Sequence, residues 1–97
     1  MKSSTKPYTE ETFRKHGTLN EYVIRTFSEN VDNDELVWHR DKESRRVHIL
    51  QGSNWQLQID DSLPEDLKVG HDYWIPGMVY HRLLKGEGDL IVRIEKI

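Results

Sequence analysis

The chain has 97 residues and a formal net charge of −3, with 32% charged and 35% hydrophobic residues. This length gives one domain with a single modest core, and the negative charge argues against a nucleic-acid partner, which requires a basic surface. Cysteine is absent, which excludes disulfides and thiolate metal sites. No apolar run reaches transmembrane length, and the first residues lack an apolar signal segment, so we expect a cytoplasmic protein with no membrane partner.

The first part of the chain, residues 1–18, is polar and predicts an N-terminal arm, followed by one domain over residues 19–97. Within the arm, residues 9–15 (TEETFRK) are consistent with one helical turn. Thr9 would be its N-cap and Thr12 its third helical residue.

Seven later runs have the composition or the period-two alternation of β-strands. They are residues 19–28, 36–41, 46–51, 55–60, 71–75, 78–84 and 90–97. Turn residues separate these runs, and Pro76 ends the fifth run because proline cannot donate to a strand ladder. Many short strands with almost no helix predict an all-β fold, a small sandwich or barrel.

One set of residues has the composition of a metal site. His39 and Asp41 are two positions apart, so on a strand both side chains lie on one face. His81 would come from a facing strand. Two histidines and one carboxylate hold iron(II) or a similar cation and leave coordination positions open. In the alternative interpretation, His39 and Asp41 bond to neighbours, and Arg45 or Arg46 neutralises Asp41.

Two glutamines are candidates for binding a polar ligand. Gln56 and Gln58 share the polar face of the run 55–60, opposite Trp55, Leu57 and Ile59. If the polar face is the barrel lumen, both amides orient a ligand there; otherwise they face water.

The stretch from Gly70 to His81 resembles the second sequence motif of the cupins, Gly-x5-Pro-x-Gly-x2-His. Gly70, Pro76 and His81 have that spacing. The middle glycine is displaced by one position, because Gly77 is present and Met78 occupies its place.

The first cupin motif, Gly-x5-His-x-His-x3,4-Glu-x6-Gly, is matched less completely. His39 and Gly52 match, Asp41 stands at the second histidine, Asn33 at the first glycine and Arg45 at the glutamate. The resemblance covers residues 33–97. It implies a small double-stranded β-helix, or jelly-roll barrel, with His39, Asp41 and His81 as ligands of a divalent transition metal. Iron(II) is the first expectation, and manganese, nickel and zinc are alternatives.

The substitution of arginine for glutamate at position 45 has two interpretations. Arg45 binds a carboxylate or phosphate group of a small-molecule ligand, or it pairs with Asp41 and abolishes metal binding. With metal bound, the resemblance implies a mononuclear non-haem metal dioxygenase that acts on a small polar or anionic molecule. The alternative is a non-catalytic ligand-binding or structural module without metal. We expect a homodimer in either case, because a barrel of this size exposes strand edges.

Overall fold

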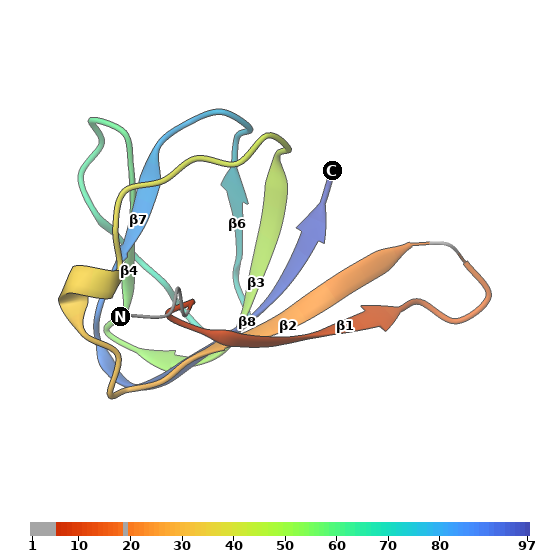
Figure 1. Cartoon of the computed structure of the whole chain (residues 1–97), viewed down its shortest axis with the longest axis horizontal. Coiled ribbons are helices and arrows are strands. Elements are labelled where there is room, and N and C mark those ends of the chain that lie inside the picture. The colour runs from red at the N-terminus through yellow and green to blue at the C-terminus, as the bar shows by residue number, and fades with distance from the viewer. Residues whose placement is uncertain (1–5, 19) are drawn as a thin grey trace, which may run out of the picture.

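A computed structural model describes residues 6–18 and 20–97. This part of the chain contains eight β-strands and one short 3-10 helix (Figure 1). The elements are β1 (Thr9–Arg14), β2 (Glu21–Phe27), η1 (Asn33–Glu35), β3 (Arg45–Ser53), β4 (Gln56–Ile59), β5 (Glu65–Asp66), β6 (Asp72–Ile75), β7 (His81–Leu84) and β8 (Glu87–Lys96).

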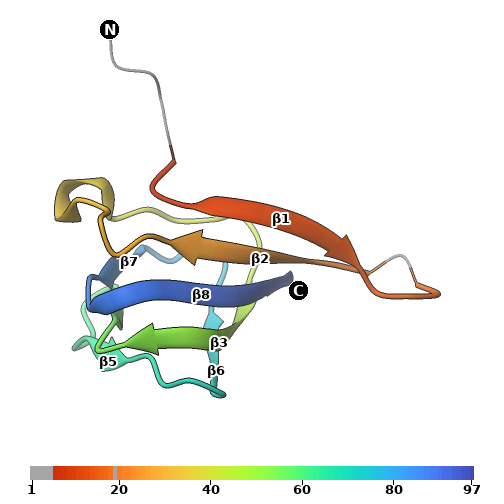
Figure 2. The ribbon, with the colours of Figure 1, turned by 90° about the horizontal axis from the view of Figure 1, so that it is seen from below.

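The strands form two antiparallel sheets that face each other. The larger sheet has the order β1-β2-β8-β3-β6, and the smaller sheet has the order β5-β4-β7. Figures 1 and 2 show β4 and β7 on one side of the molecule and β3, β8 and β2 on the other, with the β1–β2 hairpin extending beyond them. The prediction of an all-β double-stranded β-helix is confirmed, although the two sheets do not close into one continuous barrel.

Alternation along β8 fixes which face of the large sheet is inside. Leu90, Val92 and Ile94 are buried, and β3 pairs Val47 with Ile94 and Ile49 with Val92. Twelve apolar residues make the core between the sheets: Phe27, Val31, Leu36, Val47, Ile49, Trp55, Leu57, Leu67, Ile75, Leu90, Val92 and Ile94.

The predicted helical turn over residues 9–15 is wrong, because these residues form β1. β1 pairs with β2 from Thr9 opposite Thr26 to Arg14 opposite Glu21. The Tyr8 ring lies 5.3 Å from that of Phe27, which anchors the start of β1 to the core. A long-range partner, which local sequence does not reveal, thus decides the conformation of this segment.

The predicted strand over residues 36–41 is also wrong. The acidic stretch before it ends in η1, and the extended chain that follows makes a single β-bridge, between His39 and His81. The predicted strand over 78–84 is shortened to β7, because Met78 has a φ of 63°, which interrupts an extended strand. β3 and β8 are both longer than predicted, reaching Ser53 and starting at Glu87.

Among the described residues, no helix is long and apolar enough to cross a membrane.

Candidate metal centre

Two histidines from distant parts of the chain form the centre of the site. The amide of His39 donates to the carbonyl of His81 at 3.0 Å, and the amide of His81 donates to the carbonyl of His39 at 2.8 Å. A reciprocal pair of this kind places both side chains on the same side of the two chains. Their ring centroids are 4.3 Å apart with the planes at 62°.

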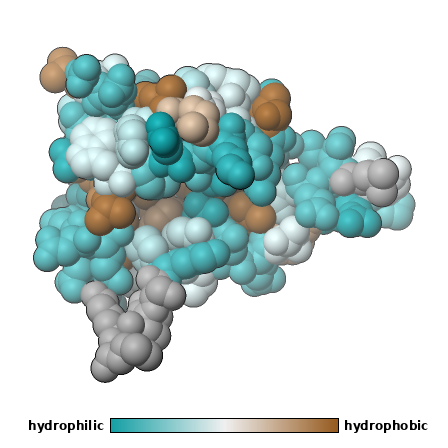
Figure 3. Space-filling model, turned by 45° about the horizontal axis from the view of Figure 1, so that its top comes forward, coloured by the Kyte–Doolittle hydropathy of each residue, from teal (hydrophilic) through white to brown (hydrophobic). Residues whose placement is uncertain are grey.

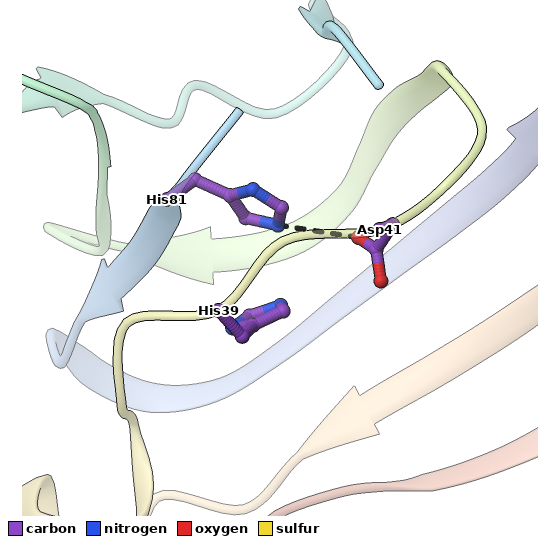
Figure 4. A group of neighbouring side chains, drawn as sticks. All are labelled: His39, Asp41 and His81. Atoms are coloured by element: carbon purple, nitrogen blue, oxygen red, sulfur yellow. Dashed lines mark ion pairs between the residues drawn. The ribbon is translucent and has the colours of Figure 1, made fainter. Parts of the chain in front are cut away.

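Asp41 joins the two histidines from the same chain segment as His39. One ligand atom from each of His39, Asp41 and His81 lies within 4.8 Å of the other two. Asp41 Oδ2 is 3.4 Å from His81 Nε2, and Figure 4 shows the three side chains directed into a common space. The structure therefore brings together the three residues that the sequence analysis selected as ligands.

The turn after Pro76 holds the segment that carries Asp41. The amide of Met78 donates to the Asp41 carbonyl at 2.6 Å, and the amide of Gly77 donates to Ser44 Oγ at 2.9 Å. A Cβ atom on Gly77 would lie 2.6 Å from the carbonyl oxygen of Lys42. Only glycine allows this approach, so Gly77, directly after Pro76, positions a ligand that is more than thirty residues away in sequence.

Both imidazole rings present Nε2 to the shared space. Nδ1 of His39 lies 3.0 Å from the Val37 carbonyl oxygen, and Nδ1 of His81 lies 3.0 Å from that of Val79. A carbonyl accepts only from a protonated Nδ1, so in the neutral ring the lone pair is on Nε2. In other metalloproteins, the ring nitrogen that does not bind the metal donates a hydrogen bond of this kind, and that bond orients the histidine.

His81 is the buried member of the set, with 5% of its surface exposed. Burial lowers the pKa of His81 below its usual 6.5, and the nearby His39 and Arg45 add to this effect. The hydrogen bond to Val79 and the charge of Asp41 act in the opposite direction. The net result favours the neutral imidazole, which is the form that binds a metal.

The carboxylate of Asp41 supports the fit of a cation. Its Oδ2 atom is buried and has no hydrogen-bond donor among the residues that the structure describes. Buried carboxylate oxygens are normally satisfied by a donor or an ion. Ligand atoms at about 2.1 Å from a common ion lie about 3 to 3.4 Å apart, whereas those of the three side chains lie up to 4.8 Å apart, so the side chains would have to move closer together to bind one.

Arg45, the first residue of β3, reaches the same carboxylate from the other side. Its Nη2 atom is 3.4 Å from Asp41 Oδ1, and its side chain is 15% exposed. Its Nε atom is buried and has no acceptor within residues 6–18 and 20–97. Asp41 therefore has one oxygen beside a cation and the other beside a histidine.

A cavity of about 1070 Å³ lies between the sheets and includes the site. His39, Asp41, Arg45 and His81 contribute polar groups to its wall. Buried apolar side chains form much of the remainder, including Val47, Leu57, Leu67, Ile75, Val92 and Ile94. Figure 3 shows a recess in which apolar atoms lie between hydrophilic rims. A small molecule with an apolar body and one or two polar groups suits such a cavity.

The structure does not bring Gln56 and Gln58 to this cavity: neither is among the described residues that line it. Leu57 points inward, so its two neighbours on β4 point outward. Gln56 donates to Asp66 Oδ1, and Gln58 accepts from Arg82 Nε.

The sequence analysis did not select Arg25, a residue of β2 that lines the cavity. Its guanidinium bonds to Glu10 Oε1 and lies 3.8 Å from the centroid of the Tyr8 ring. In the sequence, Arg25 falls on the same face of the predicted strand as Val23 and Phe27, and this pattern could have identified it as facing inward.

Comparison with solved structures identifies the fold. An RmlC-like cupin with a double-stranded β-helix from Methanocaldococcus jannaschii matches 99% of this chain and 84% of its own, with a TM-score of 0.68 and 16% identity. An RmlC-like cupin from Shewanella frigidimarina matches 97% of this chain and 79% of its own, with a TM-score of 0.71 and 14% identity. The chain thus has the cupin fold, as the two sequence motifs implied.

A third similar structure is that of Fe(II)-HppE with the alternative substrate (S)-1-HPP. It matches 100% of this chain with a TM-score of 0.71 and 12% identity, and this chain spans 53% of its length. HppE is also known in a Co(II) form in complex with Tris buffer. At these identities the likeness establishes the fold alone. No protein-family model matches the sequence, and no curated protein is significantly similar to it.

Proposed function

We propose that this chain is a mononuclear metal protein of the cupin fold that acts on a small polar or anionic molecule. The observation that carries the proposal is the buried Oδ2 atom of Asp41, which has no donor in the described part of the chain and lies 3.4 Å from Nε2 of His81. Iron(II) is the first candidate, and manganese, nickel and zinc are the others.

The ion would supply Lewis-acid or redox chemistry with several coordination positions open to other ligands. The side chains of the site have separate roles. His39 and His81 hold Nε2 in place through their Nδ1 bonds to Val37 and Val79. Asp41 provides the negative charge, and apolar side chains of the core form part of the cavity wall around the site. The reaction that we propose for this arrangement is oxidation of the bound molecule by dioxygen.

The ion pair between Arg45 and Asp41 favours a second candidate function. In it the cavity binds a small molecule without metal, and Arg45 neutralises Asp41 permanently. Metal content distinguishes the two functions directly.

The test is elemental analysis of protein purified without a histidine tag, before and after anaerobic reconstitution with iron(II). We expect close to one equivalent of metal in the wild-type protein, and its loss in His81→Ala and Asp41→Asn. His71→Ala, which changes an exposed histidine outside the site, is the control and should retain the metal. A wild-type protein that remains metal-free after reconstitution would reject the metal function and support the second candidate.

A further inference from the structure

The guanidinium of Arg45 has a buried N–H group that lacks a hydrogen-bond acceptor in the described part of the chain. Its contact with Asp41 is a single ion pair through Nη2, while Nε is buried and has no acceptor among the described residues. A guanidinium presents its N–H groups as a fork that matches the two oxygens of a carboxylate. Arg45 is also one of the residues that line the cavity, so its guanidinium is next to the space in which a ligand would bind.

The same arrangement places Arg45 in competition with a metal ion. Asp41 Oδ1 faces the guanidinium and Oδ2 faces His81. A divalent cation bound by His39, Asp41 and His81 would lie close to the positive charge of Arg45, and the two cations repel each other. When both histidines are neutral, the charges of Asp41 and Arg45 cancel. The four side chains of the site then have no net negative charge to balance the charge of the ion.

We propose that Arg45 is an exchangeable counter-ion that makes the binding of metal and of a small organic carboxylate mutually dependent, an inference that rests on the metal centre proposed above. Without ligand, Arg45 pairs with Asp41. A carboxylate in the cavity accepts from Nε and an Nη of Arg45, satisfies the buried Nε, and releases Asp41 to the metal.

The apolar wall of the cavity sets the rest of the ligand class. Val47, Leu57 and Val92 line the cavity together with the polar groups of the site. A carboxylate with a short aliphatic body would pair with Arg45 and contact these side chains. Because coupling between two ligands is reciprocal, the carboxylate should raise metal affinity by the factor by which the metal raises carboxylate affinity.

The test is calorimetric titration of the full chain with Mn(II), with and without isobutyrate at constant ionic strength. For the wild-type protein we expect isobutyrate to strengthen Mn(II) binding about tenfold, within the usual range for coupled sites. Isobutyramide, which has the same shape and no charge, should have no effect. Titration of isobutyrate alone with Mn(II) corrects for binding in solution.

Three variants assign the effect to Arg45. Arg45→Gln should bind Mn(II) more tightly than wild type without isobutyrate, and isobutyrate should no longer change its affinity. Arg45→Lys retains the charge without the fork, so it should bind Mn(II) as wild type does with a weaker response to isobutyrate. Arg46→Gln is the control, because Arg46 is exposed and its nearest acidic group is Glu95 at 3.9 Å; it should behave as wild type.

The outcomes separate the two proposals. Mn(II) binding that is lost in His81→Ala but is unaffected by isobutyrate in wild type overturns the coupling and leaves the metal centre intact. An unchanged isobutyrate response in both Arg45→Gln and Arg45→Lys also overturns it. No Mn(II) binding by wild type or Arg45→Gln under any condition overturns the metal centre and the coupling with it.

Discussion

Met78 has a backbone φ of 63°, a left-handed conformation that costs an L-residue about 1–2 kcal/mol. It occupies the position at which the cupin motif has its middle glycine. The neighbouring residue is glycine for a different structural reason, since the backbone of Gly77 contacts the segment 42–44 too closely for a side chain. The turn thus has two adjacent backbone requirements, and this sequence meets one of them with glycine and the other with a strained residue.

Met78→Gly should therefore raise the free energy of unfolding by about 1 kcal/mol. The side chain is 53% exposed, so its loss removes little packing. Urea unfolding followed by tryptophan fluorescence, to which the buried Trp55 contributes, measures the change. Met78→Ala, which keeps the strain and shortens the side chain, should not be stabilised. Equal stability of the glycine and alanine variants would contradict the assignment of strain to this residue.

His81 should make the metal-free protein less stable in acid. Burial lowers its pKa in the folded state below the usual 6.5, which applies when the chain is unfolded. Between these two pKa values the unfolded chain binds a proton that the folded chain does not, so stability is lost as pH falls through that window. Above pH 6.5 the contribution is complete.

Unfolding measured from pH 8 to pH 5 with a chelator present tests this expectation. His81→Gln should have a smaller loss of stability over the range than wild type. His71→Gln, at an exposed histidine, should keep the wild-type pH dependence. The same dependence in all three proteins would show that His81 is not its source.

At the scale of elements, the site is assembled by a turn and a loop that contact each other edge to edge. The turn at 76–78 bonds to Asp41 and Ser44, and this contact sets the position of the carboxylate relative to the two histidines. Neither segment forms a regular strand. Their mutual hydrogen bonds and the bridge between His39 and His81 replace a continuous ladder.

Gly77→Ala should disturb this contact, because its Cβ would lie 2.6 Å from the Lys42 carbonyl oxygen. We expect a loss of about 1–3 kcal/mol in the free energy of unfolding and weaker metal binding, since Asp41 moves with the loop. Gly70→Ala is the matched control: Gly70 has a φ of 86° and no atom within 4 Å of its Cβ position. It should cost about 1 kcal/mol through backbone strain and leave metal affinity unchanged.

Composition and period-two alternation predicted strands that overlap β2, β3, β4, β6 and β8, and in β3, β4 and β8 the buried residues fall on one face. This reasoning failed for β1, whose six residues are all exposed and whose conformation depends on pairing with β2. It failed again for residues 36–41, where an alternating pattern meets no continuous partner. A strand forms only when a second segment pairs with it. The alternation of residues within one segment does not show which segment, if any, will pair with it.

The candidate site was predictable to a similar degree. The spacing of His39 and Asp41 and the motif ending in His81 selected three side chains that the structure places together. The same reasoning grouped Gln56 with Gln58, which do share a face, but alternation cannot say which face lines the cavity. The bulky apolar Leu57 occupies the inner side.

At the scale of the whole molecule, two sheets enclose one cavity and leave open edges. β1 and β6 are the outer strands of the larger sheet, and β1 is exposed along its full length. Unpaired strand edges favour association with a second chain. β2 is paired on both sides, with β1 and β8 of the same chain, so β1 supplies the free edge for the homodimer, which remains a prediction.

Sedimentation analysis of the wild-type chain should therefore give the mass of a dimer. Phe13 is an exposed aromatic residue on β1, stacked on Tyr22. Phe13→Asp should shift the distribution toward monomer, because it places a charge at the expected contact. Phe13→Tyr, which keeps the ring, should retain the wild-type mass. A monomer at all concentrations would contradict the prediction.

The bridge between His39 and His81 has a consequence for the lifetime of the protein. Two segments that are distant in sequence meet there through one pair of backbone hydrogen bonds and the ligand side chains. A ligand bound by those side chains also links the two ends of the segment 40–80. Its binding free energy adds to the free energy that stabilises the folded chain. Protease digestion at residues 36–44 should therefore be faster in metal-depleted protein. For the proposed metal centre, loss of the metal should therefore shorten the lifetime of the folded chain.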